Sequence, residues 1–405
     1  MPFPERITDV DEVTTSNVIN QIVFSTLFLV SGLCLIPKRK MLAQLLAKEK
    51  FLTLFLSWCL LSILWSEFGV VSFKRLFQIF TTVTVSLALL LHTDSSDQPL
   101  RYFKSILYLY IPLTLLSIIF VPGAIDPDSS TWRGLAPGKN HLGQAAMIST
   151  IIWFFAVRSA TGARKFFLSC MLVISIILLF GAKSMTSLLA LASLAALGAI
   201  LSIDEIFKPL NIGRIFSFVV MLSLVGIILS TIYFAPELMR TMPEYVDRNI
   251  TFTGRTDLWA DVFEETKKNW LHGCGFSGFW VIGNPPVMDL YEEYVWLPKQ
   301  AHMGYLDIWN ETGLVGLLLF AGMIIFYFKN LTRLEKPHLW KWFLIATLMI
   351  NLQETTLFRQ NILSGVMFIF SYLALYAELG RVENHKLELQ PGANLPKQGG
   401  PDPVF

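Results

Sequence analysis

The sequence predicts an all-α, polytopic membrane protein with about 11 (10–12) transmembrane helices and one long loop on one side of the bilayer, because a helical span needs about 20 mostly apolar residues. Of its 405 residues, 54% are hydrophobic and only 15% are charged, and the mean hydropathy is +0.55. A soluble domain carries roughly 25% charged residues, so this composition excludes an ordinary soluble fold. A net charge of +2 predicts no nucleic-acid partner.

The apolar runs are bounded by Trp, Tyr, Lys and Arg, as interfacial anchoring predicts. Residues 1–380 are therefore expected to form a single transmembrane domain. The polar, Pro- and Gly-rich segment 381–405 is predicted to be a disordered cytoplasmic tail. The spans are predicted at residues 18–36, 51–67, 74–92, 103–121, 141–157, 166–182, 185–201, 215–234, 304–328, 341–358 and 361–380.

The distribution of Lys and Arg predicts the orientation of the chain. Basic residues gather in the short connections on one side, for example between Lys38 and Lys50, and the positive-inside rule makes that side cytoplasmic. Two longer connections, 122–140 and 235–303, then lie on the outer side as a short and a long periplasmic loop. They are rich in Trp, Tyr, Gly and Arg, which favours function over disorder.

The first of these loops carries DPDSSTWRGLAPGKNHLG. Its Pro and Gly residues shape a turn that presents Arg133 and Lys139 just before a span that begins near His141. Two cations beside free backbone amides at a helix N-terminus suit an anion. The alternative is that both residues only anchor the chain at the interface.

The second loop carries NITFTGRTDLWADVFEETKKNWLHGCGFSG. Thr256 can cap a helix, which would place Arg255 just ahead of the helix N-terminus, an arrangement suited to phosphate. An exposed loop arginine is the alternative. Gly273–Gly278 formally matches the dinucleotide fingerprint G-x-G-x-x-G, but no βαβ unit surrounds it. A tight turn that returns the loop toward the membrane is the better interpretation.

The segment QAHMGYLDIWNETGLVG leads from this loop into a span. His302 lies at the predicted boundary between water and membrane, and a histidine with a pKa near 6.5 is the side chain best suited to act as a general base at neutral pH. A packing role at the interface is the alternative. No metal site is predicted, because no H-E-x-x-H or paired-carboxylate motif is present.

Three further polar groups lie near the outer ends of predicted spans. They are Trp65-Ser66-Glu67, the segment from Lys183 to Thr186, and Glu354 with Arg359. Charged groups at membrane depth are costly and often functional, but near an interface they can also reach water by snorkelling.

The motifs WRGLAPGKNHLG, TGRTDLW, GCGFSG and AHMGYLDIWNETGLVG occur in this order on a background of many spans. Together they resemble the O-antigen ligase family, a superfamily of O-antigen ligases and polymerases, with the ExoQ-type exopolysaccharide production proteins as the nearest branch. The resemblance covers about residues 50–380. It implies a bacterial inner-membrane glycosyltransferase without metal or cofactor, which transfers glycan from undecaprenyl pyrophosphate to an acceptor hydroxyl on the periplasmic side.

The resemblance also implies roles for single residues. Arg133 and Arg255, with Lys139 beside them, would bind the pyrophosphate, and His302 would be the catalytic base. The chain departs from many ligases, which have a Ser-Arg pair where this sequence has Lys183-Ser-Met-Thr-Ser. This difference suits the exopolysaccharide branch and leaves Lys183 as the local cation.

Glu311 and Arg359, like Lys183, are candidates for supporting positions at the site. The expected partners are an undecaprenyl-pyrophosphate-linked oligosaccharide, the lipid bilayer and other polysaccharide export or assembly proteins. A repeat-unit polymerase is the favoured function. The alternatives are a ligase that transfers O-antigen onto lipid A core and, in a different class, a membrane transporter that uses ionisable groups within its spans.

Overall fold

The computed structural model describes residues 18–95, 98–127, 129–207, 253–294, 296–334 and 339–388. Within these ranges all regular secondary structure is helical, and the only β-type pairing is an isolated bridge between Ile125 and Trp132. The predicted all-α class is therefore confirmed for the described chain. Its α-helices are α2 (Val18–Leu35), α3 (Arg39–Lys48), α4 (Phe51–Ser62), α5 (Gly69–Leu91), α6 (Gln98–Phe120), α7 (Lys139–Arg158), α8 (Gly162–Ala182), α9 (Met185–Phe207), α11 (Thr253–Lys268), α12 (Pro285–Glu293), α13 (Gly304–Leu331), α14 (Trp340–Ile350) and α15 (Leu363–Glu388).

Six of the described helices are long and apolar enough to cross a membrane, namely α2, α5, α6, α8, α13 and α15. Three shorter apolar helices accompany them. The chain is thus a multi-pass membrane protein, whereas the predicted total of about 11 spans is not confirmed. Each predicted span overlaps a helix except 215–234, which lies outside the described residues.

Two predicted boundaries near the C-terminus differ from the structure. The span expected at 341–358 ends as a helix at Ile350, because Asn351 turns the chain by accepting hydrogen bonds from the N–H groups of Thr356 (2.8 Å) and Leu357 (3.1 Å). Helix α15 instead continues to Glu388, so residues 381–388 of the predicted disordered tail are helical. The rest of that tail lies outside the described residues.

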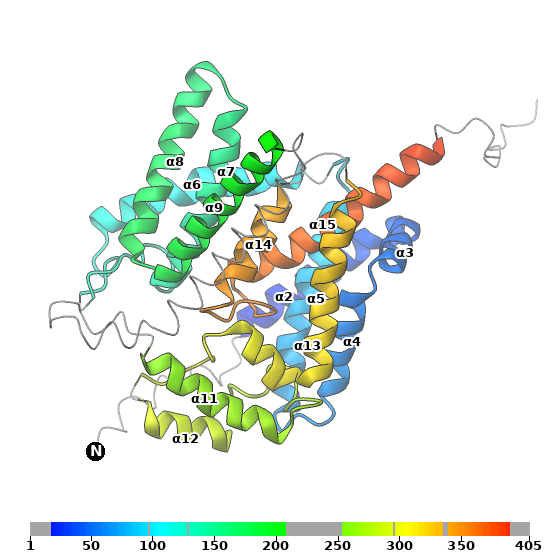
Figure 1. Cartoon of the computed structure of the whole chain (residues 1–405), viewed down its shortest axis with the longest axis vertical. Helices are drawn as coiled ribbons and strands as arrows, with labels where there is room; N and C mark the ends of the chain where they lie inside the picture. Colours follow the sequence, from blue (N-terminus) through cyan, green and yellow to red (C-terminus); the bar gives the residue numbers. More distant parts are fainter. Residues whose placement is uncertain are drawn as a thin grey trace, which may run out of the picture.

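The helices form a bundle whose two ends differ in character (Figure 1). Helices α11 and α12, from the predicted long loop, lie across the end where α4 finishes and α13 begins. At the opposite end, Glu383 of α15 bonds Lys48 (2.5 Å) and Arg333 (3.2 Å). Lys48 and Arg333, two of the basic residues that the sequence assigned to one face of the membrane, are therefore joined through Glu383.

A kink in α13 joins the α11 region to the bundle. Gly313 has φ +67° and ψ −174°, and a Cβ there would lie 2.3 Å from the Leu271 carbonyl oxygen. Beyond the kink, the N–H of Leu314 donates to Trp270 O (2.8 Å), and before it Glu311 O accepts from Gly275 N–H (3.0 Å). Trp270 and the glycine-rich turn, Gly273–Gly278, therefore supply hydrogen bonds that α13 loses at its kink, and these bonds hold the turn against the bundle.

Candidate functional site

The carboxylate of Glu354 lies at the centre of a polar cluster between α14 and α15. One oxygen, Oε1, accepts hydrogen bonds from Asn140 Nδ2 (2.8 Å) and Arg255 NH2 (3.3 Å). The other, Oε2, lies 2.8 Å from Gln300 Nε2 and 3.0 Å from His302 Nδ1. Glu354 is only 3% exposed, so this one side chain joins α7, α11 and the segment before α13.

The backbone around Glu354 is held against the start of α13 by Asn351. The N–H of Gly304 donates to Asn351 O (2.9 Å), and the Asn351 side chain donates to Thr347 O (2.7 Å) while accepting from Thr356 N–H. Gly304 must be small here, because an added Cβ would lie 2.2 Å from Asn351 Oδ1. These bonds place Glu354 opposite His302, two residues before Gly304.

His302 itself occupies a backbone conformation that is uncommon for a residue with a side chain. Its φ is +53°, and such outliers concentrate at functional sites where surrounding contacts hold them. Those contacts are on the preceding residue: Ala301 O accepts from Trp259 Nε1 (2.8 Å), and Ala301 N–H donates to Asp307 Oδ2 (3.1 Å). The backbone just before His302 is therefore held from both α11 and α13.

The charge of Glu354 fixes the tautomer of His302. Burial raises the pKa of the Glu354 carboxyl, but the hydrogen bond and charge of His302 and the Arg255 guanidinium outweigh it, and the pKa lies below its ordinary value. An ionised carboxylate only accepts, so the Nδ1 that faces it carries a proton, and in the neutral imidazole the lone pair is then on Nε2. The His302 side chain is 18% exposed, and no described residue bonds Nε2, which leaves this nitrogen available to a substrate.

Arg255 lies within the first turn of α11, which begins at Thr253, and not just ahead of the helix as predicted from Thr256. The helix starts earlier, so Arg255 itself belongs to the helical N-terminus, where the dipole favours anions. Its NH1 donates to Gln353 O (2.7 Å) besides the contact of NH2 with Glu354. The side chain is 27% exposed, and a guanidinium has five N–H donors, so several remain for a ligand.

The other predicted cations, Arg133, Lys139 and Lys183, are exposed. Lys139 is the first residue of α7 and precedes Asn140. The loop of Arg133 reaches the end of α8 through Trp132, whose N–H donates to Gly181 O (2.9 Å), and Lys183 ends that helix with φ +49°. No contact of the three with Glu354 or His302 is present among the described residues.

Two further predicted residues, Glu311 and Arg359, form a separate, buried ion pair. Arg359 NH2 lies 2.9 Å from Glu311 Oε1, and its NH1 lies 3.0 Å from Oε2. Asp307 approaches the same guanidinium at 3.5 Å. Burial lowers the pKa of Arg359, but the two carboxylates outweigh it and raise the pKa overall. Ser277 N–H and Oγ bond this pair as well, so it holds the glycine-rich turn.

Sequence reasoning missed two members of the cluster, because it assigned nothing to Asn140 or Gln300. Their only signal in the sequence is adjacency to Lys139 and His302. Sequence reasoning did single out Glu354 but grouped it with Arg359, whereas the structure pairs Glu354 with His302. In the described parts of the chain, no group of three or more His, Cys, Asp or Glu residues could hold a metal ion.

The fold and this cluster define a class: a multi-pass helical membrane protein with a histidine–carboxylate pair and an arginine at one end of its bundle. The family model described as O-antigen ligase matches residues 170–321, which include Arg255 and His302. The exopolysaccharide production protein ExoQ of Rhizobium meliloti (strain 1021) is 27% identical over 237 residues, or 54% of this chain and 52% of that protein. The match thus spans about half the length of this curated relative. The resemblance to the O-antigen ligase family, with an ExoQ-type relative, is confirmed.

Proposed function

We propose that this protein is a membrane glycosyltransferase of polysaccharide biosynthesis. It transfers glycan from undecaprenyl pyrophosphate to an acceptor sugar hydroxyl at the periplasmic face of the bacterial inner membrane. The observation that carries the proposal is the His302–Glu354 pair with Arg255 bonded to the same carboxylate. The base can remove the proton of the acceptor hydroxyl, and the cation can neutralise the leaving group, which are the two requirements of such a transfer.

The first need is to remove the proton of the acceptor hydroxyl. Nε2 of His302 accepts this proton as the hydroxyl oxygen attacks the anomeric carbon, and Glu354 stabilises the imidazolium through Nδ1–H. General-base catalysis of this kind is typically worth roughly 10²–10⁴-fold in rate. The orientation is preset, because the hydrogen bond from Nδ1 keeps the lone pair on Nε2.

The second need is to neutralise the leaving group. The bond between the anomeric carbon and the pyrophosphate oxygen breaks with its electron pair, and undecaprenyl pyrophosphate departs with increased negative charge. Arg255 is proposed to bind this pyrophosphate, with Arg133 and Lys139 as further ligands and Lys183 as the cation at the end of α8. Preorganised cations aimed at developing charge are a large source of rate enhancement, and here they would take the place of a metal ion.

Attack on the side opposite the leaving group inverts the configuration of the anomeric centre. The products are a glycan lengthened at the acceptor oxygen and free undecaprenyl pyrophosphate, and the proton on His302 then passes to solvent. Glu311 and Arg359 contribute by position alone, because their ion pair is buried and bonded to the glycine-rich turn.

The acceptor is proposed to be another lipid-linked repeat, which makes the protein a polymerase. The name of the relative, an exopolysaccharide production protein, supports this choice, while the O-antigen ligase description of the family model favours transfer onto lipid A core. Both reactions use the same base and cations, so they differ in what fills the acceptor side of the site.

The test supplies purified protein with lipid-linked repeats alone and separates the products on a gel. A ladder of lengthened glycans is expected. Transfer only after lipid A core is added would make the protein a ligase, and no transfer to either acceptor would refute the glycosyltransferase. A transporter would move lipid-linked repeats between the leaflets of a vesicle without forming any new glycosidic bond.

A further inference from the structure

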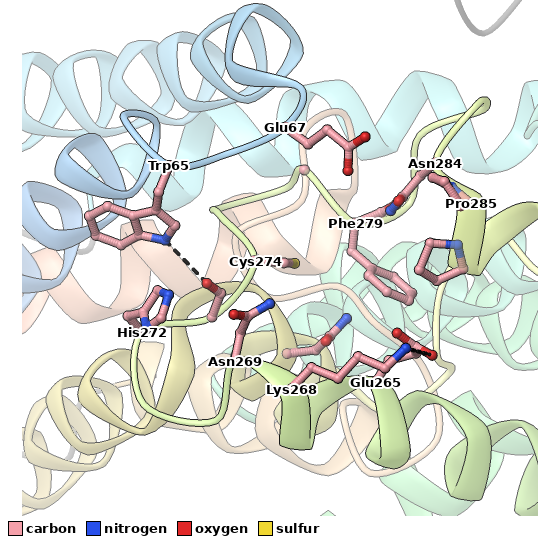
Figure 2. Close-up of a pocket in the computed structure, with 14 residues that line it drawn as sticks. Trp65, Glu67, Glu265, Lys268, Asn269, His272, Cys274, Phe279, Asn284 and Pro285 are labelled. Carbon is pink, nitrogen blue, oxygen red and sulfur yellow. Dashed lines mark hydrogen bonds and ion pairs between the residues drawn. The ribbon is translucent and has the colours of Figure 1, made fainter.

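A cavity of about 320 Å³ lies beside the glycine-rich turn, away from the His302–Glu354 pair. It is bounded by the turn between α4 and α5, the end of α11 and the start of α12. In Figure 2, Trp65 and His272 lie on one side of it and Phe279 with Pro285 on the other. Its volume is at the lower end of the roughly 300–1,000 Å³ of small-molecule sites. It is lined by Trp65, Glu67, Glu265, Lys268, Asn269, His272, Gly273, Cys274, Gly278, Phe279, Asn284, Pro285, Pro286 and Asn310.

One lining side chain has an unsatisfied hydrogen-bond donor. Asn310 is 2% exposed, and its Oδ1 accepts from Thr266 Oγ1 (3.3 Å). Its Nδ2 has no hydrogen-bond partner within the described part of the chain. A buried donor left unpaired costs free energy, so a group in the cavity that accepts a hydrogen bond would recover it. This unpaired amide points to a polar ligand.

The charges of the cavity disfavour an anion as that ligand. Lys268 is paired with Glu265 at 2.7 Å, and Glu67 has no ion-pair partner among the described residues, so the lining carries a net negative charge. The start of α12 offers no anion site either, since its first two residues are Pro285 and Pro286, which lack N–H groups. A pyrophosphate or phospholipid headgroup would be repelled.

The same lining suits a sugar ring. Trp65 uses its N–H on Gly273 O (3.1 Å) and contacts the rings of Trp58 and His272, so the ring surface that it leaves open to the cavity is apolar. Phe279 lines the cavity as well but is only 3% exposed. Apolar ring surface packs against the C–H faces of a pyranose. Carboxylates accept hydrogen bonds from sugar hydroxyls, and amides such as those of Asn269 and Asn310 both donate and accept.

We propose that this cavity binds an uncharged sugar segment of the glycan, at a distance from the bond that forms. The inference rests on the proposed function for the identity of the glycan. Glu265 and Arg255 are ten residues apart on α11, which separates the cavity from the pyrophosphate site by about 15 Å at 1.5 Å per residue. A glycan whose reacting end lies at His302 can therefore extend along α11 toward the cavity.

The test measures binding of the repeat oligosaccharide freed from its lipid by mild acid, which carries no pyrophosphate. Calorimetric titration uses the whole purified protein in nanodiscs. Glu67→Gln and Asn269→Ala change exposed side chains and are each expected to weaken binding about tenfold, the effect of one lost hydrogen bond to a charged or polar group. Glu264→Gln is the matched control, because this carboxylate lies on α11 outside the cavity, paired with Lys267.

Unchanged affinity in both cavity variants, or no binding by the wild-type protein, would overturn the inference. His302→Ala separates it from the proposed function, because this variant should still bind the free oligosaccharide while losing transfer. If the wild-type protein bound the oligosaccharide in a way that depends on Glu67 but had no transferase activity, the sugar site would be supported and the proposed function would be refuted.

Donor and acceptor glycans carry the same sugars, and kinetics distinguish which of them occupies the cavity. Shorter polymers from Asn269→Ala would place the growing chain there, because that chain would dissociate sooner. A higher repeat concentration for half-maximal rate, at unchanged polymer length, would place the incoming single repeat there.

Discussion

Replacing Glu354 by Gln separates the charge of this side chain from its shape. Its carboxylate receives four donors, two on each oxygen, and an amide can accept on one side only. The amide oxygen should stay with the cationic Arg255, because turning an N–H toward a guanidinium is repulsive. The amide nitrogen then faces His302 Nδ1 and donates to it. The imidazole proton moves to Nε2, which can no longer accept a proton from the acceptor hydroxyl.

The expected loss in Glu354→Gln is therefore the whole general-base contribution, roughly 10²–10⁴-fold in turnover. This corresponds to about 2.7–5.4 kcal/mol in activation free energy at 1.36 kcal/mol for each factor of ten. The assay is the rate of glycan transfer by purified protein with saturating lipid-linked repeats. Glu292→Gln, an exposed carboxylate of α12, is the control for a carboxyl-to-amide change and should keep wild-type turnover.

A double variant tests whether Glu354 acts through His302. Residues that work as a unit have effects that do not add, so His302→Ala/Glu354→Gln should be no slower than His302→Ala alone. If the two losses multiplied instead, Glu354 would act on the substrate or on folding independently of the histidine. Retention of more than about a tenth of wild-type turnover in Glu354→Gln would refute the tautomer argument.

Four further outcomes are expected. His302→Ala should lose the same general-base contribution, roughly 10²–10⁴-fold in turnover, yet still bind lipid-linked donor in a pull-down, and a loss of both would indicate misfolding. Arg255→Lys should be much slower in the same transfer assay, because a point charge cannot fork onto two phosphate oxygens; near-normal turnover would reduce its role to diffuse charge. Excess chelator should leave turnover unchanged. Phosphatase fusions at Ser130 and Asp289 should be active, whereas cytoplasmic fluorescence from either position would overturn the periplasmic assignment of the site.

The apolar helices were predictable from sequence because each is encoded locally, by a run of apolar residues bounded by polar or aromatic ones, whereas the polar helices α3 and α12 were not predicted. The predicted span 304–328 and helix α13, Gly304–Leu331, begin at the same residue for this reason. The kink at Gly313 was not predicted, since it depends on hydrogen bonds from a segment about 40 residues earlier in the chain. The early end of α14 likewise depends on Asn351, whose side chain bonds the backbone on both sides of it.

Those residues of the candidate site whose side-chain type and position in the sequence indicate a function could be predicted. His302 and Arg255 stand out as a neutral-pH base and a cation near a helix start. Their joint partner Glu354 is 52 residues from His302 and 99 from Arg255, and no local pattern connects them. The sequence analysis grouped Glu354 only with Arg359, its near neighbour in the chain, whereas the fold places the two side chains in different clusters.

The two carboxylates of this region differ in role because they differ in environment. Glu311 meets Arg359 through both oxygens, and breaking such a buried pair leaves an uncompensated charge at a cost of several kcal/mol. That pair is suited to holding the kink and the glycine-rich turn in place. Glu354 is bonded to His302 and Arg255 instead, and these two side chains are 18% and 27% exposed. Its partners can therefore meet a substrate and change protonation, while the rigid pair beside them fixes the start of α13 and so the position of His302.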